Sequence, residues 1–235
     1  MKAHMGLFQQ PANALIVMTK APEPGQSKTR LVPPLSFAEA ADLARALLLD
    51  QLNNLAQLSG ARLFIAFTPE TAAGFFERFA AQGFASFLQQ GHSLGERMSH
   101  AFQYLFDGGF GNIILIGSDL PALSLALFDQ AYAWLGHGEA DVVLGPSTDG
   151  GYYLIGMNRL ISDIFQDMSW SRDDVLARTT EKLAGLGVRY ELLPLGYDID
   201  TSEDLRRLQS HCDQRDVSMK NTATLLHELR RRGKV

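Results

Sequence analysis

Two acidic turns that lie far apart in the sequence carry residue types that bind divalent cations. Asp119 follows the strongly apolar run 112–116 in the string Gly-Ser-Asp-Leu-Pro, and Asp200 lies in the string Tyr-Asp-Ile-Asp-Thr. Mg²⁺ and Mn²⁺ prefer hard oxygen ligands and usually share them with substrate phosphates, so one or two protein carboxylates suffice. We therefore predict that Asp119 and Asp200 hold one Mg²⁺ or Mn²⁺ ion. The alternative for Asp119 is that it only caps its own turn.

A basic loop follows the first apolar run and has the composition of a phosphate-binding segment. It places Lys20, Lys28 and Arg30 around a flexible glycine, Gly25. Cationic side chains and free backbone N–H groups at this edge of a sheet can hold a diphosphate or triphosphate. The loop lacks the glycines of a P-loop and of a G-x-G-x-x-G turn, which argues against an NAD-linked dehydrogenase. An ordinary solvated loop is the alternative interpretation.

A glycine-rich turn supplies a third set of candidate residues. Gly150 and Gly151 permit positive φ angles and a close approach of the backbone to a substrate. Asp149 precedes them and is predicted to orient the acceptor, although Asp-Gly is also a common tight-turn sequence. Arg97 stands in the first turn of a predicted helix, where it is assigned to a phosphate or a base, with pairing to a nearby carboxylate as the alternative.

The acidic segment around Asp200 contains further carboxylates whose roles differ. In an extended segment Asp198 and Asp200 point the same way, because side chains alternate. Glu203 and Asp204 are explained by the positive end of the helix that follows, so we assign them no chemistry. The segment also resembles the nucleophile motif of aspartyl-phosphate hydrolases. That alternative is weaker, because Ser202 stands where the motif needs Thr or Val.

Apolar runs alternate with helical patterns and must position these residues. Strands are expected at 14–18, 63–67, 85–88, 112–116, 141–144, 152–155 and 188–193, and helices at 36–58, 69–81, 95–106, 124–135, 172–186 and 201–209. Strands that are apolar throughout are buried on both faces, which predicts a mostly parallel sheet between two layers of helices. Ligands of such sheets bind beyond the carboxyl ends of the strands, where the candidate loops begin.

Length and composition narrow the classes of protein. The chain has 235 residues, 46% of them hydrophobic, and a net charge of −5. We expect a single domain over 1–235, with a core at about 13–210 and a C-terminal helical tail at 213–235. The acidic balance argues against nucleic-acid binding. Apolar runs too short to cross a membrane, no apolar signal-peptide core and one cysteine favour a soluble cytoplasmic protein. The sequence does not indicate an oligomeric state.

Taken in order, the motifs resemble those of a known family. The matching strings are Lys20 with Ala-Pro-x-Pro-Gly-x-x-Lys-Thr-Arg-Leu, then Leu-Gly-x-Arg-Met, Gly-Ser-Asp-Leu-Pro, Gly-Pro-x-x-Asp-Gly-Gly-Tyr-Tyr-Leu-Ile-Gly and Asp-Ile-Asp-Thr-x-Glu-Asp-Leu. They resemble bacterial glycosyltransferase-A-like (GT-A) proteins, a nucleotide-diphospho-sugar transferase group related to 2-phospho-lactate guanylyltransferase and including the type linked to arsenosugar biosynthesis. The resemblance implies a three-layer α/β/α sandwich with a mostly parallel mixed sheet. It also implies a divalent metal held by Asp119 and completed by Asp200, and phosphate contacts from the loop Lys20–Arg30.

These expectations define a function and its alternatives. We expect a metal-dependent transferase that uses a nucleotide-sugar or nucleoside triphosphate donor, with glycosyl transfer to a small-molecule acceptor as the leading hypothesis. Asp119 and Asp149 are its candidate catalytic residues. Nucleotidyl transfer of the guanylyltransferase type, which releases pyrophosphate, is the first alternative. A non-catalytic nucleotide-binding module is the second.

Overall fold

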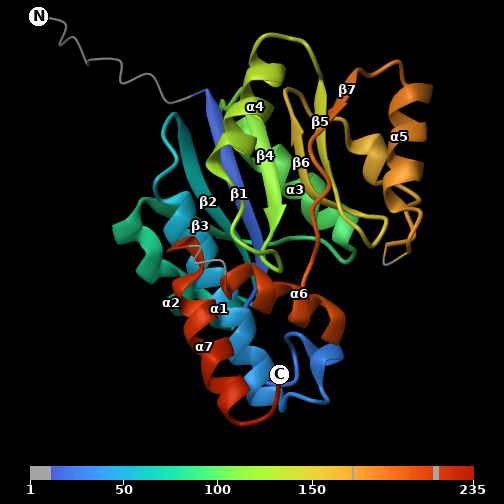
Figure 1. Ribbon diagram of the computed structural model, residues 1–235. Coiled ribbons are helices and arrows are strands. Elements are labelled where there is room, and N and C mark those ends of the chain that lie inside the picture. The colour runs from blue at the N-terminus through green and yellow to red at the C-terminus, as the bar shows by residue number, and fades with distance from the viewer. Residues whose placement is uncertain (1–11, 171, 214–216) are drawn as a thin grey trace, which may run out of the picture.

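A seven-stranded mixed sheet forms the centre of the molecule (Figure 1). The computed structural model describes residues 12–170, 172–213 and 217–235. In the order β3-β2-β1-β4-β6-β5-β7, the strands are β3 (Phe84–Leu88), β2 (Ala61–Thr68), β1 (Asn13–Lys20), β4 (Asn112–Gly117), β6 (Tyr152–Met157), β5 (Val142–Pro146) and β7 (Tyr190–Leu192). Among these, only β6 runs antiparallel to its neighbours. The predicted mostly parallel mixed sheet is therefore confirmed.

Helices cover both faces of the sheet, which confirms the predicted three layers (Figure 1). The helices are α1 (Phe37–Leu55), α2 (Ala73–Glu77), α3 (Leu94–Asp107), α4 (Leu125–Gly136), α5 (Val175–Gly185), α6 (Ser202–Asp213) and α7 (Lys220–Arg231), with 3₁₀ turns η1 (Thr29–Leu31), η2 (Glu70–Ala72), η3 (Arg78–Gln82), η4 (Ser162–Phe165) and η5 (Val217–Met219). Successive β1 residues alternate between the faces: Leu15 packs with α1, α2 and α4, whereas Ile16 packs with α3 and α5. The longest helix starts at the predicted capping box, in which Ser36 and Glu39 each accept from the other's backbone N–H.

Two predicted helices differ from the structure for identifiable reasons. The segment predicted as one helix over 69–81 is broken into η2, α2 and η3. Gly74 weakens the helix there, while Phe76 and Phe79 are buried in the core, so side-chain packing fixes the path of the chain. Helix α5 begins three residues later than predicted, because Asp173, just before the helix, packs on the glycine turn, and the first turn of the helix is bonded to it. The backbone N–H of Leu176 donates to the Gly150 carbonyl oxygen at 2.9 Å.

The C-terminal segment packs on α1 through a third apolar cluster. Within the predicted tail 213–235, Leu226 and Leu229 of α7 are buried against Leu43 and Leu47 of α1. Helix α6 contributes to the same cluster. Figure 1 shows α6 and α7 beside α1, below the sheet. No helix in the described part of the chain is long and apolar enough to cross a membrane. The N-terminal stretch considered for a signal peptide lies mostly outside the described residues.

A carboxylate of α1 caps helix α7, and we expect its removal to destabilise the protein. Asp50 is 2% exposed and accepts hydrogen bonds from the backbone N–H groups of Asn221 and Thr222, at 2.9 and 2.7 Å. These are orphan donors in the first turn of α7, where a negative charge is favourable. Asp50→Ala is expected to lower the free energy of unfolding by about 2 kcal/mol, measured in urea. Asp42→Ala, on the exposed face of α1, is the control and is expected to change it by less than about 0.5 kcal/mol.

Candidate functional site

The two predicted metal-binding carboxylates lie together, because the segments that carry them are hydrogen-bonded. The backbone N–H of Ile199 donates to the carbonyl oxygen of Asp119 at 2.9 Å, which fixes the segment before α6 against the turn after β4. Both carboxylates face one ammonium group: Lys28 Nζ lies 2.8 Å from Asp119 Oδ1 and 3.4 Å from Asp200 Oδ1. Arg30 Nη1 lies 3.6 Å from Asp200 Oδ2. The structure therefore brings together two acids and two cations from three segments.

Lys28 is the buried member of this cluster. Its side chain is 1% exposed, whereas the side chains of Asp119 and Asp200 are 55% and 42% exposed. Its backbone has a φ angle of 52°, in the left-handed region that residues other than glycine seldom adopt. Such strained conformations cost free energy and concentrate at functional sites. The ammonium group thus lies beneath two carboxylates whose remaining surface faces solvent.

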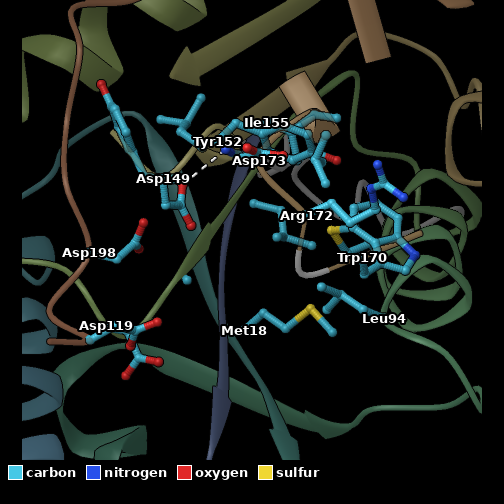
Figure 2. A pocket seen from close by; sticks show the side chains of 18 of the residues that line it. Met18, Leu94, Asp119, Asp149, Tyr152, Ile155, Trp170, Arg172, Asp173 and Asp198 are labelled. Carbon is cyan, nitrogen blue, oxygen red and sulfur yellow. Dashed lines mark hydrogen bonds between the residues drawn. The ribbon is translucent and has the colours of Figure 1, made fainter. Parts of the chain in front are cut away.

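The carboxylates open into a cavity of about 840 Å³ (Figure 2). Its lining combines acidic, basic, aromatic and aliphatic side chains. They come from β1, β4, β6 and α3, from the basic loop and the glycine turn, and from the segments around the starts of α5 and α6. The lining residues are Met18, Arg30, Leu94, Met98, Leu115, Gly117, Asp119, Asp149, Gly151, Tyr152, Tyr153, Leu154, Ile155, Trp170, Arg172, Asp173, Val175, Asp198 and Asp200. Figure 2 shows Asp119 and Asp198 on one side, and Leu94 and Trp170 on the other.

The predicted glycine turn forms one wall of the cavity. Asp149 accepts a hydrogen bond from the backbone N–H of Gly151 at 2.9 Å, and both residues line the cavity. Gly150 has a φ angle of 86°, and a Cβ atom there would lie 2.0 Å from the carbonyl oxygen of Asp173. The absence of a side chain at Gly150 therefore lets the Asp173 segment pack directly on the turn.

We expect Gly150→Ala to disturb both stability and the cavity wall. The added methyl group combines the left-handed φ angle with a contact too short for any real Cβ, against backbone that cannot rotate away. The predicted loss of unfolding free energy is more than about 2 kcal/mol, measured by denaturant unfolding. Gly185→Ala is the control, because a Cβ there meets nothing within 4 Å. Equal stability of the two variants would contradict this account of the turn.

Asp198 is a partly buried carboxylate that lines the cavity, and it was not predicted to bind the metal. Ser147 Oγ donates a hydrogen bond to Asp198 Oδ2 at 2.6 Å. Burial raises the pKa of Asp198 to about 6, with smaller contributions from the charges of Asp149 and Asp200, although the Ser147 hydrogen bond acts in the opposite direction. The alternation of Asp198 with Asp200 was the sequence signal for it.

Two predicted phosphate-binding residues lie apart from the carboxylate cluster. Lys20 Nζ donates to Gln26 Oε1 at 2.9 Å on the exposed side of the basic loop. Arg97 Nε donates to the carbonyl oxygen of Gly91 at 3.0 Å and closes the loop before α3. Neither residue lines the cavity. The structure therefore places Lys28 and Arg30 at the cluster and does not bring Lys20 or Arg97 there.

The remaining acidic and aromatic residues divide between structure and site. Asp204 accepts from the backbone N–H of Thr201 at 2.7 Å, the capping role expected for it. The Tyr153 hydroxyl donates to the carbonyl oxygen of Pro194 at 3.0 Å, and burial raises the pKa of Tyr153 to about 12.

Arg172 and Asp173 line the cavity. Sequence reasoning missed both, because it assigned them to the first turn of a helix.

Asp119 and Asp200 are the described residues best suited to a divalent metal. The described parts of the chain contain no group of three or more His, Cys, Asp or Glu side chains arranged to hold a metal ion. A two-carboxylate site still fits Mg²⁺, which commonly takes one or two carboxylates and completes its shell with water and substrate phosphates. Lys28 Nζ shows that the space between the carboxylates accommodates positive charge.

Nearly the whole chain is similar to a protein of known structure. It superposes on the crystal structure of a candidate nucleotide-diphospho-sugar transferase from Desulfovibrio desulfuricans G20 with a TM-score of 0.85 and 35% identity, covering 94% of this chain and 96% of that one. A cytidylyltransferase from Leptospira borgpetersenii serovar Hardjo-bovis (strain JB197) shares the fold, with a TM-score of 0.60, 13% identity and coverage of 94% and 95%.

Sequence comparison confirms the predicted relationship to guanylyltransferases. The chain is 31% identical over 121 residues to phosphoenolpyruvate guanylyltransferase of Mycobacterium leprae (strain Br4923). That match covers 50% of this chain and 55% of the relative, so the chain spans about half the length of the curated relatives it matches. Residues 51–172, just over half of the chain, match the bacterial family described as "Uncharacterized protein conserved in bacteria (DUF2064)". By this match the chain belongs to the DUF2064 family, and its 35% identity over nearly the full length relates it to the candidate nucleotide-diphospho-sugar transferase from Desulfovibrio.

Proposed function

We propose that the protein is a metal-dependent transferase that moves a group from a nucleotide donor to a small-molecule acceptor. The observation that carries the proposal is the cluster of Asp119, Asp200 and Lys28 at the mouth of a large cavity. Two half-exposed carboxylates beside two cations suit a polyphosphate that arrives with a divalent metal. The names of the similar proteins, all transferases that act with nucleotides or nucleotide-sugars, support the same class.

Each member of the cluster has a role that follows from its position. Asp119 and Asp200 would hold Mg²⁺ or Mn²⁺, which when bound neutralises charge on the donor phosphates. Lys28, fixed beneath the carboxylates, orients them, and Arg30, 72% exposed, can reach phosphate oxygens from the rim. Asp149, on the wall of the same cavity, accepts a hydrogen bond from an acceptor hydroxyl and orients it.

The donor chemistry has two candidates, each supported by a similar protein. A nucleotide-sugar donor is our first proposal, supported by the transferase that matches nearly the full chain at 35% identity. A nucleoside triphosphate donor with nucleotidyl transfer is the second, supported by the guanylyltransferase that matches half of the chain at 31% identity. In both reactions the donor phosphates leave with negative charge, which the same cluster stabilises.

Product analysis tests the proposal and separates the two reactions. The purified protein would be titrated by calorimetry with GTP, CTP, GDP-mannose and UDP-glucose in the presence of Mn²⁺, and then incubated with the donors that bind and with candidate acceptors. Release of a nucleoside diphosphate identifies glycosyl transfer, and release of pyrophosphate identifies nucleotidyl transfer. Binding without turnover under all these conditions would favour a non-catalytic nucleotide-binding module and contradict the proposal.

A further inference from the structure

The cavity has an acidic side and an apolar side, and we propose that the apolar side takes an uncharged, hydroxyl-bearing acceptor with a hydrocarbon or aromatic body. The inference rests on the proposed function, because it names the acceptor class of that same site. An uncharged acceptor would distinguish this protein from an enzyme whose acceptor is a small acid with several negative charges.

Apolar side chains form a wall of the cavity away from the carboxylate cluster. Trp170, Met98 and Ile155 belong to or pack against the apolar core on the α3 and α5 face of the sheet, and all three also line the cavity. Leu94 also lines the cavity, and 46% of its surface is exposed, so a ligand in the cavity can reach it. Figure 2 shows Leu94 beside Trp170, on the side opposite Asp119. Ligand sites commonly combine such an apolar wall with a few polar groups that fix orientation.

The charges in the lining disfavour an anionic acceptor. Five carboxylates line the cavity, whereas its cationic lining residues among those described are Arg30 and Arg172. Both arginines already have a carboxylate partner, since Arg30 lies 3.6 Å from Asp200, and Arg172 Nε lies 3.2 Å from Asp174 Oδ1. Lys28 and the proposed metal offset Asp119 and Asp200, but Asp149, Asp173 and Asp198 would still repel an anionic acceptor. The repulsion would be strongest where water is excluded.

The same carboxylates suit a hydroxyl group. Ionised carboxylates accept hydrogen bonds and donate none, so they recognise donors such as an alcohol. Asp149 and Asp198 line the cavity together with the cluster at which the donor phosphates are proposed to bind. An acceptor whose body packs on Trp170 and Leu94 can thus present its hydroxyl toward the acidic side. Burial of the body would supply affinity, and the carboxylates would supply orientation.

A matched series of probes tests this inference by fluorescence. Trp134→Phe leaves Trp170 as the one tryptophan, because the chain has two. In that variant we would titrate 1-butanol, 1-hexanol, hexanoate and phosphoenolpyruvate and follow the Trp170 emission. We expect 1-hexanol to bind about tenfold more tightly than 1-butanol, because each buried methylene strengthens binding several-fold. Hexanoate has the same body and differs in its charge, and we expect it to bind at least about tenfold more weakly than 1-hexanol.

A pair of variants tests whether the probes bind at the proposed wall. Leu94→Asp is expected to weaken 1-hexanol binding about fivefold or more, and its exposed position at the start of α3 tolerates an acid. Phe37→Asp is the matched control, because Phe37 is 51% exposed, begins helix α1 as Leu94 begins α3, and lies outside the cavity lining. Equal effects of the two substitutions would overturn the proposed site.

The remaining outcomes separate this inference from the proposed function. Tighter binding of hexanoate or phosphoenolpyruvate than of 1-hexanol overturns the inference and leaves the transferase proposal standing. Displacement of 1-hexanol by GTP with Mn²⁺ also overturns it, since the apolar wall would then hold the nucleobase. Failure of every nucleotide to bind in calorimetry, with the alcohol series intact, overturns the proposed function and with it the acceptor role of the cavity.

Discussion

Replacing Asp119 by asparagine is expected to lower turnover by about a thousandfold while leaving the fold intact. The substitution removes one of two carboxylates proposed to hold the metal and leaves Lys28 with Asp200 alone. Groups that stabilise charge developing in a transition state typically contribute factors of about 10² to 10³. The turn itself should survive, because Ile199 donates to the backbone carbonyl of Asp119 and the side chain is half exposed. The measurement is the initial rate at saturating donor and Mn²⁺, together with thermal unfolding.

A surface aspartate provides the control for this variant. Asp129 lies on the exposed face of α4, outside the cavity lining, and Asp129→Asn changes the net charge of the protein by the same amount. We expect its turnover to match that of the wild type. Electron paramagnetic resonance of Mn²⁺ would also show weaker metal binding for Asp119→Asn. A rate within about threefold of the wild type would remove Asp119 from the reaction.

The sheet and the acidic cluster were predictable because each rests on a local signal. Fully apolar runs such as 112–116 bury both faces of a strand, so their position in a central sheet follows from composition. Loops that follow parallel strands meet at one edge, which brings the Asp119 turn near the loop of Lys28. Asp200 has no such strand before it in the structure. Asp200 was predicted at the cluster from the family resemblance and because a divalent metal commonly takes a second carboxylate.

Other parts of the site depend on pairings that a sequence does not display. Nothing local distinguishes Lys28 from Lys20, yet one ammonium group is buried between two acids and the other is exposed beside Gln26. Arg97 is a residue type that commonly binds phosphate, but here its guanidinium donates a hydrogen bond to the carbonyl oxygen of Gly91. Arg172 was predicted to lie in a helix. The contact between Asp173 and Gly150, which keeps this segment out of the helix, joins residues distant in the sequence. The positions of Lys28 and Arg172 are set by tertiary contacts, whereas Lys20 and Arg97 are held by partners six residues away.

Lys28→Met is expected to separate donor binding from metal binding. Methionine is unbranched and similar in reach, and it keeps the left-handed φ angle occupied by a residue with a Cβ, so the backbone strain is unchanged. The variant loses the ammonium group 2.8 Å from Asp119 and the positive charge it offers to donor phosphates. We expect kcat/KM for the donor to fall about a hundredfold, measured by initial rates. Mn²⁺ should bind more tightly than in the wild type, because the carboxylates lose the ammonium group that competes with the metal for them.

Donor turnover is expected to weaken while Mn²⁺ binding strengthens, and this combination distinguishes the proposed role of Lys28 from simpler ones. A lysine that serves only to support the fold would, on removal, loosen the turn and weaken metal and donor binding together. A lysine that only contacts phosphate would leave Mn²⁺ binding unchanged in the absence of donor. Tighter Mn²⁺ binding with weaker donor turnover is expected only if the ammonium group and the metal share the two carboxylates. Lys220→Met, at the exposed start of α7, is the control for loss of one positive charge and should change neither quantity.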